Sequence, residues 1–231
     1  MTPVLVVDVG GSHVKVLATG EQESRRADSG PDLTAAQMVE AALNLAADWT
    51  WDGVSVGVPS PVHGGRVIAE PVNLGEGWVG FDYTGAFGKP TKVVNDAAMQ
   101  ALGSYEGGRM LFLGLGTGLG SALVANGFVQ PMELGHLPYK KATFEDYVGV
   151  RGLKKYGNKK WRRYVVDVVE RLIAALEPED VVLGGGNVHK LKKLPPGCRA
   201  GDNINAFRGG FRLWENSKVP RTPNGAARQR T

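Results

Sequence analysis

The stretch Val4-Leu5-Val6-Val7-Asp8-Val9-Gly10-Gly11-Ser12-His13-Val14-Lys15 decides the fold of this 231-residue chain. Its first six residues are apolar except for Asp8 and predict a buried strand that ends at the Gly10-Gly11-Ser12 turn. The apolar pattern resumes from His13 to Ala18, so the stretch predicts a β-hairpin. Residues 25–28 add a possible edge strand.

The same order of strand, glycine turn and strand occurs again in the middle of the chain. Residues 110–113 and 119–125 flank the second glycine turn, and residues 5–12 can be laid over residues 111–118. Two weakly similar halves predict a duplicated domain with a cleft between the copies. Chance similarity between two glycine-rich hairpins is the competing explanation.

The remaining pattern alternates strands and helices, which is typical of an α/β protein. Helices are expected at 33–47, after 95, at 144–148 and at 160–176; strands are expected at 54–58, 92–94 and 181–183, with a hairpin turn at 64–65. Residues from Ser217 onward are polar, basic and rich in Pro and Gly, so 217–231 is predicted to be a disordered tail.

Composition narrows the class of protein. Apolar residues make up 42% of the chain and charged residues 22%, as in ordinary globular proteins. Cys198 is the single cysteine, which excludes an intrachain disulfide and a multi-cysteine zinc site. No stretch approaches the roughly 20 apolar residues of a membrane span, and the apolar start is too short for a signal peptide. We therefore expect a soluble, cytoplasmic protein.

Both glycine turns have the composition of a phosphate site. Gly10 and Gly11 allow phosphate oxygens to approach backbone N–H groups, Ser12 adds a hydroxyl donor and Lys15 a positive charge. Asp8 at the end of a buried strand can hold Mg²⁺. An ordinary hairpin turn explains the first loop equally well. The second loop, 114–120, has four glycines in seven residues, more than a turn requires, and favours a phosphate cradle.

Two further segments carry polar groups suited to a sugar. Asn95-Asp96 follows a strand and opens a helix, so Asp96 is either a helix cap or a base that accepts the proton of an attacking hydroxyl. Glu133-Leu134-Gly135-His136 follows the second hairpin. Its carboxylate and imidazole suit sugar hydroxyls, which both donate and accept hydrogen bonds.

Taken in order, these motifs resemble the ROK family of bacterial sugar kinases. The resemblance runs from residue 4 to about 186 and rests on the segments 8–15, Val58-Pro59-Ser60-Pro61, Asn73 with Trp78, Asn95-Asp96-Ala97, 116–121, 133–136 and Gly184-Gly185-Gly186.

The resemblance implies the two-lobed, actin-like ATPase (ribonuclease-H-like) fold with a cleft between an N-terminal lobe, 1–95, and a C-terminal lobe, 96–216. It implies Asp96 as the general base for a sugar 6-hydroxyl and Asp8 as the metal ligand. The implied sugar ligands are Ser60, Asn73, Asn95, Glu133, His136 and Glu145. The implied ligands of the phosphoryl donor are Gly10, Gly11, Ser12, Lys15, Gly116, Thr117, Gly118 and Gly185.

One departure from the family pattern concerns zinc. ROK kinases often carry a Cys-x-Cys-Gly zinc segment between the Glu-x-Gly-His motif and the later sugar-binding Glu, whereas this chain has Leu137 to Thr143 there, without cysteine. The absence of zinc, the compact length and the helix from Trp161 resemble the polyphosphate glucokinase branch. The basic residues at 151–163 suit a polyphosphate donor if they line its path, although a solvated helix face is the default interpretation.

We therefore predict a Mg²⁺-dependent hexose kinase acting on glucose or a similar sugar, with polyphosphate or ATP as donor. An ATP-dependent kinase for mannose, fructose or an N-acetylhexosamine is the alternative. A non-catalytic sugar sensor is disfavoured because the first strand begins too early for a preceding DNA-binding segment. The family implies a homodimer, and we expect neither a nucleic-acid nor a membrane partner.

Overall fold

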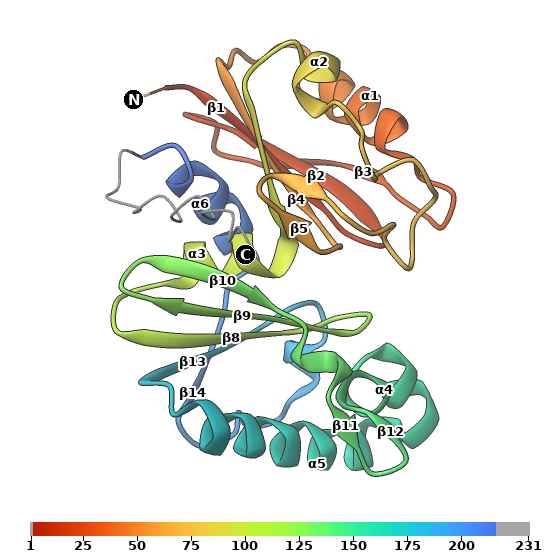
Figure 1. The fold of residues 1–231 in the computed structure, drawn as a ribbon, viewed down its shortest axis with the longest axis vertical. Coiled ribbons are helices and arrows are strands. Elements are labelled where there is room, and N and C mark those ends of the chain that lie inside the picture. The colour runs from red at the N-terminus through yellow and green to blue at the C-terminus, as the bar shows by residue number, and fades with distance from the viewer. Residues whose placement is uncertain (1, 216–231) are drawn as a thin grey trace, which may run out of the picture.

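Two five-stranded sheets stand one above the other, with two helices between them and further helices on their outer faces (Figure 1). This arrangement comes from a computed structural model that describes residues 2–215. The predicted tail, 217–231, lies outside the described residues.

The upper sheet has the strand order β3-β2-β1-β4-β7. Strands β1, β2 and β3 pair antiparallel, whereas β1, β4 and β7 pair parallel. The elements of this part of the chain are β1 (Val4–Val9), β2 (His13–Ala18), β3 (Arg25–Asp28), α1 (Ala35–Leu45), β4 (Gly53–Val58), β5 (Val62–His63), β6 (Arg66–Val67), α2 (Tyr83–Phe87) and β7 (Thr91–Asn95).

The lower sheet repeats this topology with the order β10-β9-β8-β13-β14: three antiparallel strands followed by two parallel ones. Its elements are α3 (Asp96–Ser104), β8 (Arg109–Leu115), β9 (Leu119–Ala125), β10 (Phe128–Met132), β11 (Pro138–Tyr139), β12 (Ala142–Thr143), α4 (Phe144–Val148), α5 (Val150–Leu176), β13 (Asp180–Gly184), β14 (Cys198–Ala200) and α6 (Asn205–Arg212). Short 3₁₀ turns occupy Leu134–His136 and Val188–Lys190.

Side-chain alternation along the first strand of each sheet explains the layers. Leu5, Val7 and Val9 of β1 pack toward α1, whereas Val4 and Val6 pack toward α6. Successive side chains of a strand point to opposite faces, so Asp8 shares the inner face with Val4 and Val6. In β8 the alternation repeats, with the odd-numbered leucines facing α5 and Met110 and Phe112 facing α3. The inner face of the upper sheet, which packs toward α6, therefore carries the candidate site residue Asp8.

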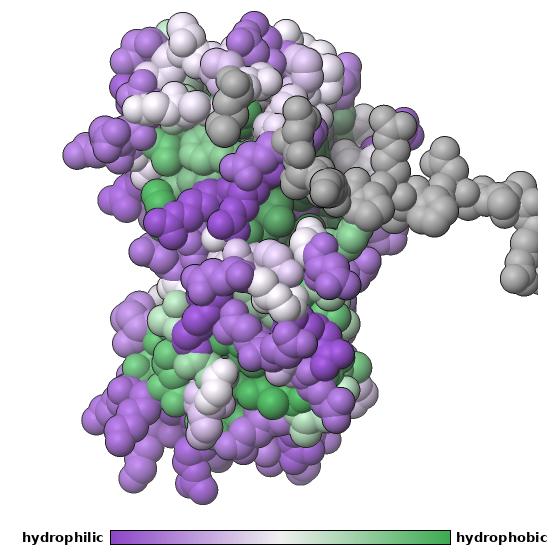
Figure 2. All heavy atoms as spheres, turned by 90° about the vertical axis from the view of Figure 1, so that its left-hand side faces the viewer, coloured by the Kyte–Doolittle hydropathy of each residue, from purple (hydrophilic) through white to green (hydrophobic). Residues whose placement is uncertain are grey.

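Helices α3 and α6 cross between the sheets at unusually close range because glycines line their contact. A Cβ on Gly103 would lie 1.8 Å from the Asn205 carbonyl oxygen, and one on Gly209 would lie 1.8 Å from that of Met99. The α6 backbone is also tied to the upper sheet, where the Ser55 hydroxyl donates to the Gly210 carbonyl at 2.7 Å. Figure 2 views the side of the molecule where α6 lies and shows mostly hydrophilic side chains with apolar patches between them.

Most predicted elements are confirmed, and the duplication is confirmed by the matching strand orders. The long helix begins at Val150 rather than at Lys160, and Gly157, with φ +68°, breaks it near that point. Strands β10, β11, β12 and β14 and helices α2 and α6 were not predicted. Helix α6 escaped prediction because its Gly209-Gly210 pair is unfavourable for a helix in isolation.

Candidate active site

Asp96 stands at the first position of α3, between the two sheets. The cap of this helix is Asn95, whose side-chain oxygen accepts the Ala98 N–H at 3.1 Å. Asp96 is therefore not needed as the cap, and within residues 2–215 its only hydrogen bond from another residue is that of the adjacent Ala97 N–H at 2.8 Å. The structure thus removes the main reason for interpreting Asp96 as merely a helix-capping residue.

The environment of Asp96 raises its pKa to about 7. Desolvation by burial is the largest cause, and the negative charges of Asp8 and Glu133 add to it. A carboxyl group with such a pKa is half ionised near neutral pH, which is the condition under which a general base works best.

Asp8 reaches this site from β1. It lies opposite Lys15 in the hairpin register, with 3.9 Å between Asp8 Oδ2 and Lys15 Nζ. It also lies beside Gly57 of β4, where a Cβ would approach Asp96 Cα to 3.5 Å. Burial raises the pKa of Asp8, and the Lys15 charge counteracts part of that rise. Two carboxylates, Asp8 and Asp96, are therefore close enough to influence each other's ionisation.

The first glycine turn, Gly10-Gly11-Ser12, leaves Gly11 and Ser12 exposed. The Gly10 N–H donates to the His13 carbonyl at 2.9 Å, and the Ser29 hydroxyl donates to the Gly10 carbonyl at 2.6 Å. These bonds fix the backbone of the turn.

The second glycine turn is fixed by two segments from later in the chain. The Val150 N–H at the start of α5 donates to the Thr117 carbonyl at 3.0 Å. Asn187 donates from its backbone to the Leu115 carbonyl at 2.9 Å and from its side chain to the Gly116 carbonyl at 3.1 Å. Sequence reasoning did not single out Asn187, although it directly follows the Gly184-Gly185-Gly186 run.

Gly185 occupies a position that no side chain could share. Its φ is +84°, and a Cβ there would lie 2.7 Å from the backbone nitrogen and oxygen of Leu115. Both the left-handed conformation and the close packing require glycine. The run 184–186 thus supports the second glycine turn through backbone contact.

The two glycine turns come together although they belong to different sheets. A Cβ on Gly11 would lie 3.7 Å from the Thr117 hydroxyl oxygen and 4.0 Å from Asn73 Cβ. Three predicted site residues from three separate segments therefore meet at one point.

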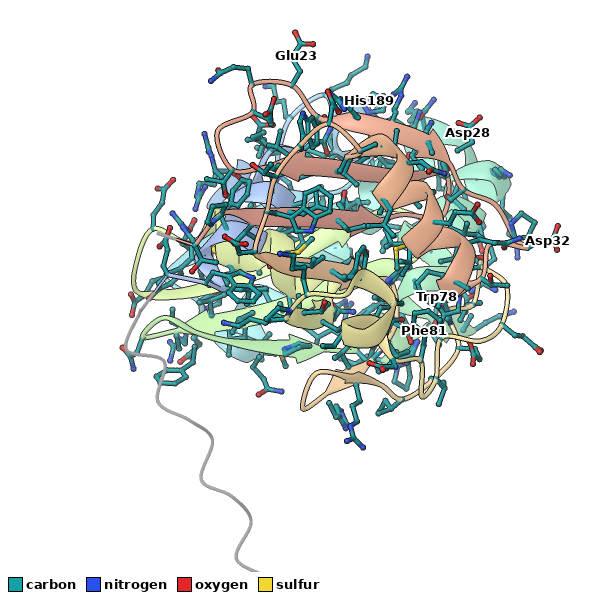
Figure 3. The ribbon with its side chains drawn as sticks, turned by 90° about the horizontal axis from the view of Figure 1, so that it is seen from above. Glu23, Asp28, Asp32, Trp78, Phe81 and His189 are labelled. Carbon is teal, nitrogen blue, oxygen red and sulfur yellow. The ribbon has the colours of Figure 1, made fainter. Side chains whose placement is uncertain are left out.

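The exposed residue Asn73 is carried by a loop that is anchored at Trp78. Trp78 is fully buried, and its indole N–H donates to the Leu33 carbonyl at 3.3 Å. The Glu70 carboxylate accepts the backbone N–H groups of Trp78 and Val79. Figure 3 shows Trp78 and Phe81 close together near α2. A rigid base of this kind holds a ligand-binding loop in place.

Glu133, His136 and Glu145 form the opposite side of the site. Glu133 Oε2 lies 3.9 Å from His136 Nε2, and both side chains are exposed. Burial raises the pKa of Glu133, and its neighbour Glu145 raises it further, while His136 opposes both. A Cβ on Gly118 would lie 2.5 Å from Glu145 Oε2, which places this carboxylate against the second glycine turn.

Arg151 is a further charged residue of the site that sequence reasoning counted only within the basic run. Its guanidinium lies 3.2 Å from the Glu145 carboxylate and 3.1 Å from that of Asp146. Arg151 therefore neutralises part of the negative charge beside the second glycine turn.

Ser60 and Asn95 are less available to a ligand than the other predicted residues. Ser60 is buried and its hydroxyl donates to the Ala69 carbonyl. The Asn95 side chain is used twice, as the α3 cap and as a donor to the Ser60 carbonyl at 3.2 Å. The structure brings both next to Asp96, where their bonds tie the Pro59-Ser60-Pro61 loop to the start of α3.

The segment that replaces the zinc loop, Leu137 to Thr143, folds as the β11–β12 hairpin and is held by packed tyrosines. The rings of Tyr139 and Tyr147 meet edge to face at 5.0 Å, and Tyr147 stacks on Tyr156 at 5.4 Å. The Tyr139 hydroxyl donates to Asp167 of α5. Aromatic packing thus holds this loop in place.

Within residues 2–215, no group of three or more His, Cys, Asp or Glu side chains is arranged to hold a metal ion by itself. No helix in the same range is long and apolar enough to cross a membrane.

The duplicated sheets, with α3 and α6 between them, define the two-lobed actin-like ATPase fold. The chain is similar to the polyphosphate glucokinase of Mycobacterium tuberculosis (strain H37Rv), with 29% identity over 214 residues that cover 82% of this chain and 80% of that protein. These findings confirm the resemblance to the ROK sugar kinases that the motifs indicated.

Two solved structures share the fold. The inorganic polyphosphate/ATP-glucomannokinase of Arthrobacter sp. strain KM superposes with a TM-score of 0.79 at 22% identity and covers 92% of this chain and 98% of its own. The ROK family glucokinase of Streptomyces griseus, in complex with glucose and AMPPNP, superposes with a TM-score of 0.76 at 16% identity, covering 91% and 98%. No protein-family model matches the chain.

Proposed function

We propose that this protein is a hexose kinase that transfers a phosphoryl group from polyphosphate or ATP to the 6-hydroxyl of glucose or a similar hexose. The observation that carries the proposal is the position of Asp96, which is free of the capping role and lies where the two sheets meet. The similarity to polyphosphate glucokinases supports the class of reaction and both donors.

In this mechanism Asp96 accepts the proton of the sugar hydroxyl as that oxygen attacks the terminal phosphorus of the donor. Its pKa of about 7 matches the task, because the ionised form is populated and still binds a proton readily. Asn73, Glu133, His136 and Glu145 would bind the other sugar hydroxyls, with Ser60 and Asn95 holding the loop and the helix start in position.

The two glycine turns would bind the donor through backbone N–H groups, and Lys15 would contribute positive charge. Asp8 is the residue that fits a bound Mg²⁺: Mg²⁺ is commonly held by one or two carboxylates together with substrate phosphates, and Asp8 lies at the phosphate turn with a neighbouring carboxylate. When bound, the ion would neutralise charge that develops on the transferred group.

The contact of Gly11 with Thr117 implies that the lobes part to admit substrates and close again around them. Closure would exclude water and prevent wasteful hydrolysis of the donor.

The test is a panel of hexoses, each assayed with ATP and with polyphosphate by a coupled measurement of sugar phosphate. Formation of a hexose 6-phosphate with either donor supports the proposal. A purified, folded protein that phosphorylates no hexose with either donor, and binds sugar without turnover, would contradict it and favour the sugar-sensor alternative.

A further inference from the structure

Outside the site around Asp96, cations and tyrosine rings alternate in one continuous row on the face of α5. Lys155 lies over the Tyr156 ring at 5.3 Å, and Lys160 lies over Tyr156 at 5.2 Å and over Tyr164 at 5.9 Å. We name this the cation–tyrosine row; its members in spatial order are Lys155, Tyr156, Lys160, Tyr164, Lys140, Tyr139 and Arg171.

The second half of the row comes from a different part of the chain. Lys140, at the tip of the β11–β12 hairpin, lies 5.7 Å from the Tyr164 ring and 5.1 Å from the Tyr139 ring. Arg171 lies over Tyr139 at 5.8 Å. The hairpin therefore contributes Lys140 and Tyr139 between Tyr164 and Arg171 of the helix, so the row is a product of the tertiary structure.

A hollow of about 380 Å³ opens along this part of the surface. Four positively charged side chains line it, Lys140, Lys160, Arg163 and Arg171, against the single carboxylate of Asp167. That carboxylate is already occupied, since Arg171 lies 3.2 Å from it and Tyr139 donates to it. Within residues 2–215, Lys140, Lys155 and Lys160 have no carboxylate at ion-pair distance. The hollow is therefore complementary to an anion.

Lys140 occupies its position at a conformational cost. Its φ is +55°, the left-handed region in which a hairpin tip usually carries Gly or Asn. Non-glycine residues held in this region cost roughly 1 kcal/mol or more and often mark functional positions. A lysine at the tip is explained by its side chain, which completes the row.

The row begins next to the donor turn. The Val150 N–H binds the Thr117 carbonyl, and Arg151 lies against Glu145 beside Gly118. From Val150 to Lys155 the helix advances only about 8 Å at a rise of about 1.5 Å per residue. A phosphate chain that leaves the second glycine turn thus meets this end of the row directly.

We propose that the cation–tyrosine row binds the distal part of a long polyphosphate chain whose terminal phosphate lies between the glycine turns. This inference rests on the proposed function. Polyphosphate has one negative charge per residue along its length, which matches the three lysines of the row, none of which has a carboxylate at ion-pair distance within residues 2–215. ATP places its phosphates in the donor turns and has none left for the row.

The tyrosines favour polyphosphate over a nucleic acid. Bases bind single-strand sites by stacking on open ring faces. Tyr139 is only 6% exposed and its ring lies beneath Lys140 and Arg171, while the half-buried Tyr156 and Tyr164 have lysines over their rings. These rings hold cations in place rather than offering a stacking surface.

The experiment uses the double variant Lys140→Gln/Lys160→Gln, in which both substituted side chains are exposed. We expect the KM for long-chain polyphosphate to rise roughly tenfold, about 1.4 kcal/mol. The KM values for ATP and tripolyphosphate should stay the same. The slope of log KM for the long chain against log salt should also become less steep, since fewer counterions are exchanged.

The matched control is Arg26→Gln/Lys89→Gln, which removes two positive charges from exposed positions, Arg26 on β3 and Lys89 in the turn before β7, where Lys89 lies 3.4 Å from Asp52. It should leave the KM for every donor unchanged. Unchanged long-chain KM in the Lys140→Gln/Lys160→Gln variant, or an equal rise for all donors or in the control, would overturn the proposal.

Direct binding of end-labelled polyphosphate separates this inference from the proposed function. If the protein phosphorylates no hexose, the proposed function fails, and weaker binding by the Lys140→Gln/Lys160→Gln variant than by the control still supports the row. Equal binding by both overturns it. Single-stranded RNA that displaces the label as effectively as unlabelled polyphosphate would overturn the assignment to polyphosphate.

Discussion

Gly11 and Thr117 lie against each other across the two sheets: a Cβ on Gly11 would be 3.7 Å from the Thr117 hydroxyl oxygen. Each residue sits in the turn of its own hairpin, and the two hairpins occupy equivalent places in the duplicated fold. The two glycine turns, one from each sheet, therefore meet at this point.

A bulky residue at this contact should interfere with donor binding. Gly11 lacks a positive φ, so Gly11→Ala should be tolerated, whereas Gly11→Leu would fill the space between the turns. We expect the leucine variant to raise the donor KM roughly tenfold or more, because the turns can no longer close on the phosphates. Steady-state kinetics would check this prediction: the donor KM should rise while the affinity for the sugar stays unchanged. Equal kinetics for the leucine and alanine variants would argue against a donor site at this contact.

Replacing Asp96 with Asn should separate catalysis from binding. The amide keeps the size of the side chain but cannot accept the sugar proton, so kcat should fall roughly 10²–10⁴-fold. Sugar affinity, measured by calorimetry, should change little. If rate and affinity fall together, or if the rate is unaffected, Asp96 is not the base.

The rate should depend on pH through the ionisation of Asp96. Its pKa of about 7 means that kcat/KM should fall as pH decreases below 7, with the acidic limb set by this group. The negative charge of Glu133 raises that pKa, so Glu133→Gln should move the acidic limb to lower pH. A limb that keeps its position in this variant would assign it to another group.

The free energy of unfolding should also depend on the ionisation of Asp96. It should decrease as pH rises, whereas kcat/KM should increase. Because the folded-state pKa of Asp96 is raised above its ordinary 3.8, the folded protein binds more protons than the unfolded chain between about pH 4 and 7. Its unfolding free energy therefore loses a contribution as pH rises through that window. Asp96→Asn removes this loss, so the variant should be more stable than the wild type above pH 7 by about 1–3 kcal/mol. This range follows from the pKa shift, reduced because Asp96 is partly exposed.

Denaturant unfolding of the wild type and of Asp96→Asn at pH 5 and pH 8 provides the comparison. The advantage of the variant should be larger at pH 8 than at pH 5. If the stability difference between the variant and the wild type is independent of pH, burial of the Asp96 charge does not lower the stability of the folded protein.

Gly185 should tolerate no side chain, in contrast to its neighbour. Gly185→Ala would place a Cβ 2.7 Å from the Leu115 backbone at a φ of +84°, so it should cost about 1–3 kcal/mol of stability and weaken donor binding. Gly186→Ala meets nothing within 4 Å and should be nearly neutral. Thermal unfolding and donor KM for the two variants test this contrast. Similar behaviour of both would show that the run at 184–186 does not support the donor turn.

Many elements of the fold could be predicted from residue patterns in the sequence. The hairpins at 4–18 and 109–125 follow from continuous apolar runs interrupted by glycine, and the start of α3 near Asn95-Asp96 follows from residue type and position. These signals are local, so a chain segment specifies them without its neighbours. Helix α6 has no such signal, because its glycines are favoured only by the close approach of α3 and β1.

The functional assignments divide in a similar way. The sequence alone determined two glycine turns, the Asn95-Asp96 pair, the Glu133–His136 loop and the family resemblance, because each depends on residues that are neighbours in the chain. Only the tertiary structure decided that Asn95 and not Asp96 caps α3, that Gly11 meets Thr117, and that the β11–β12 hairpin places Lys140 and Tyr139 in the cation–tyrosine row. The physical reason is that burial, charge coupling and close contact depend on distances between segments remote in sequence, which are fixed only when the two sheets pack around α3 and α6.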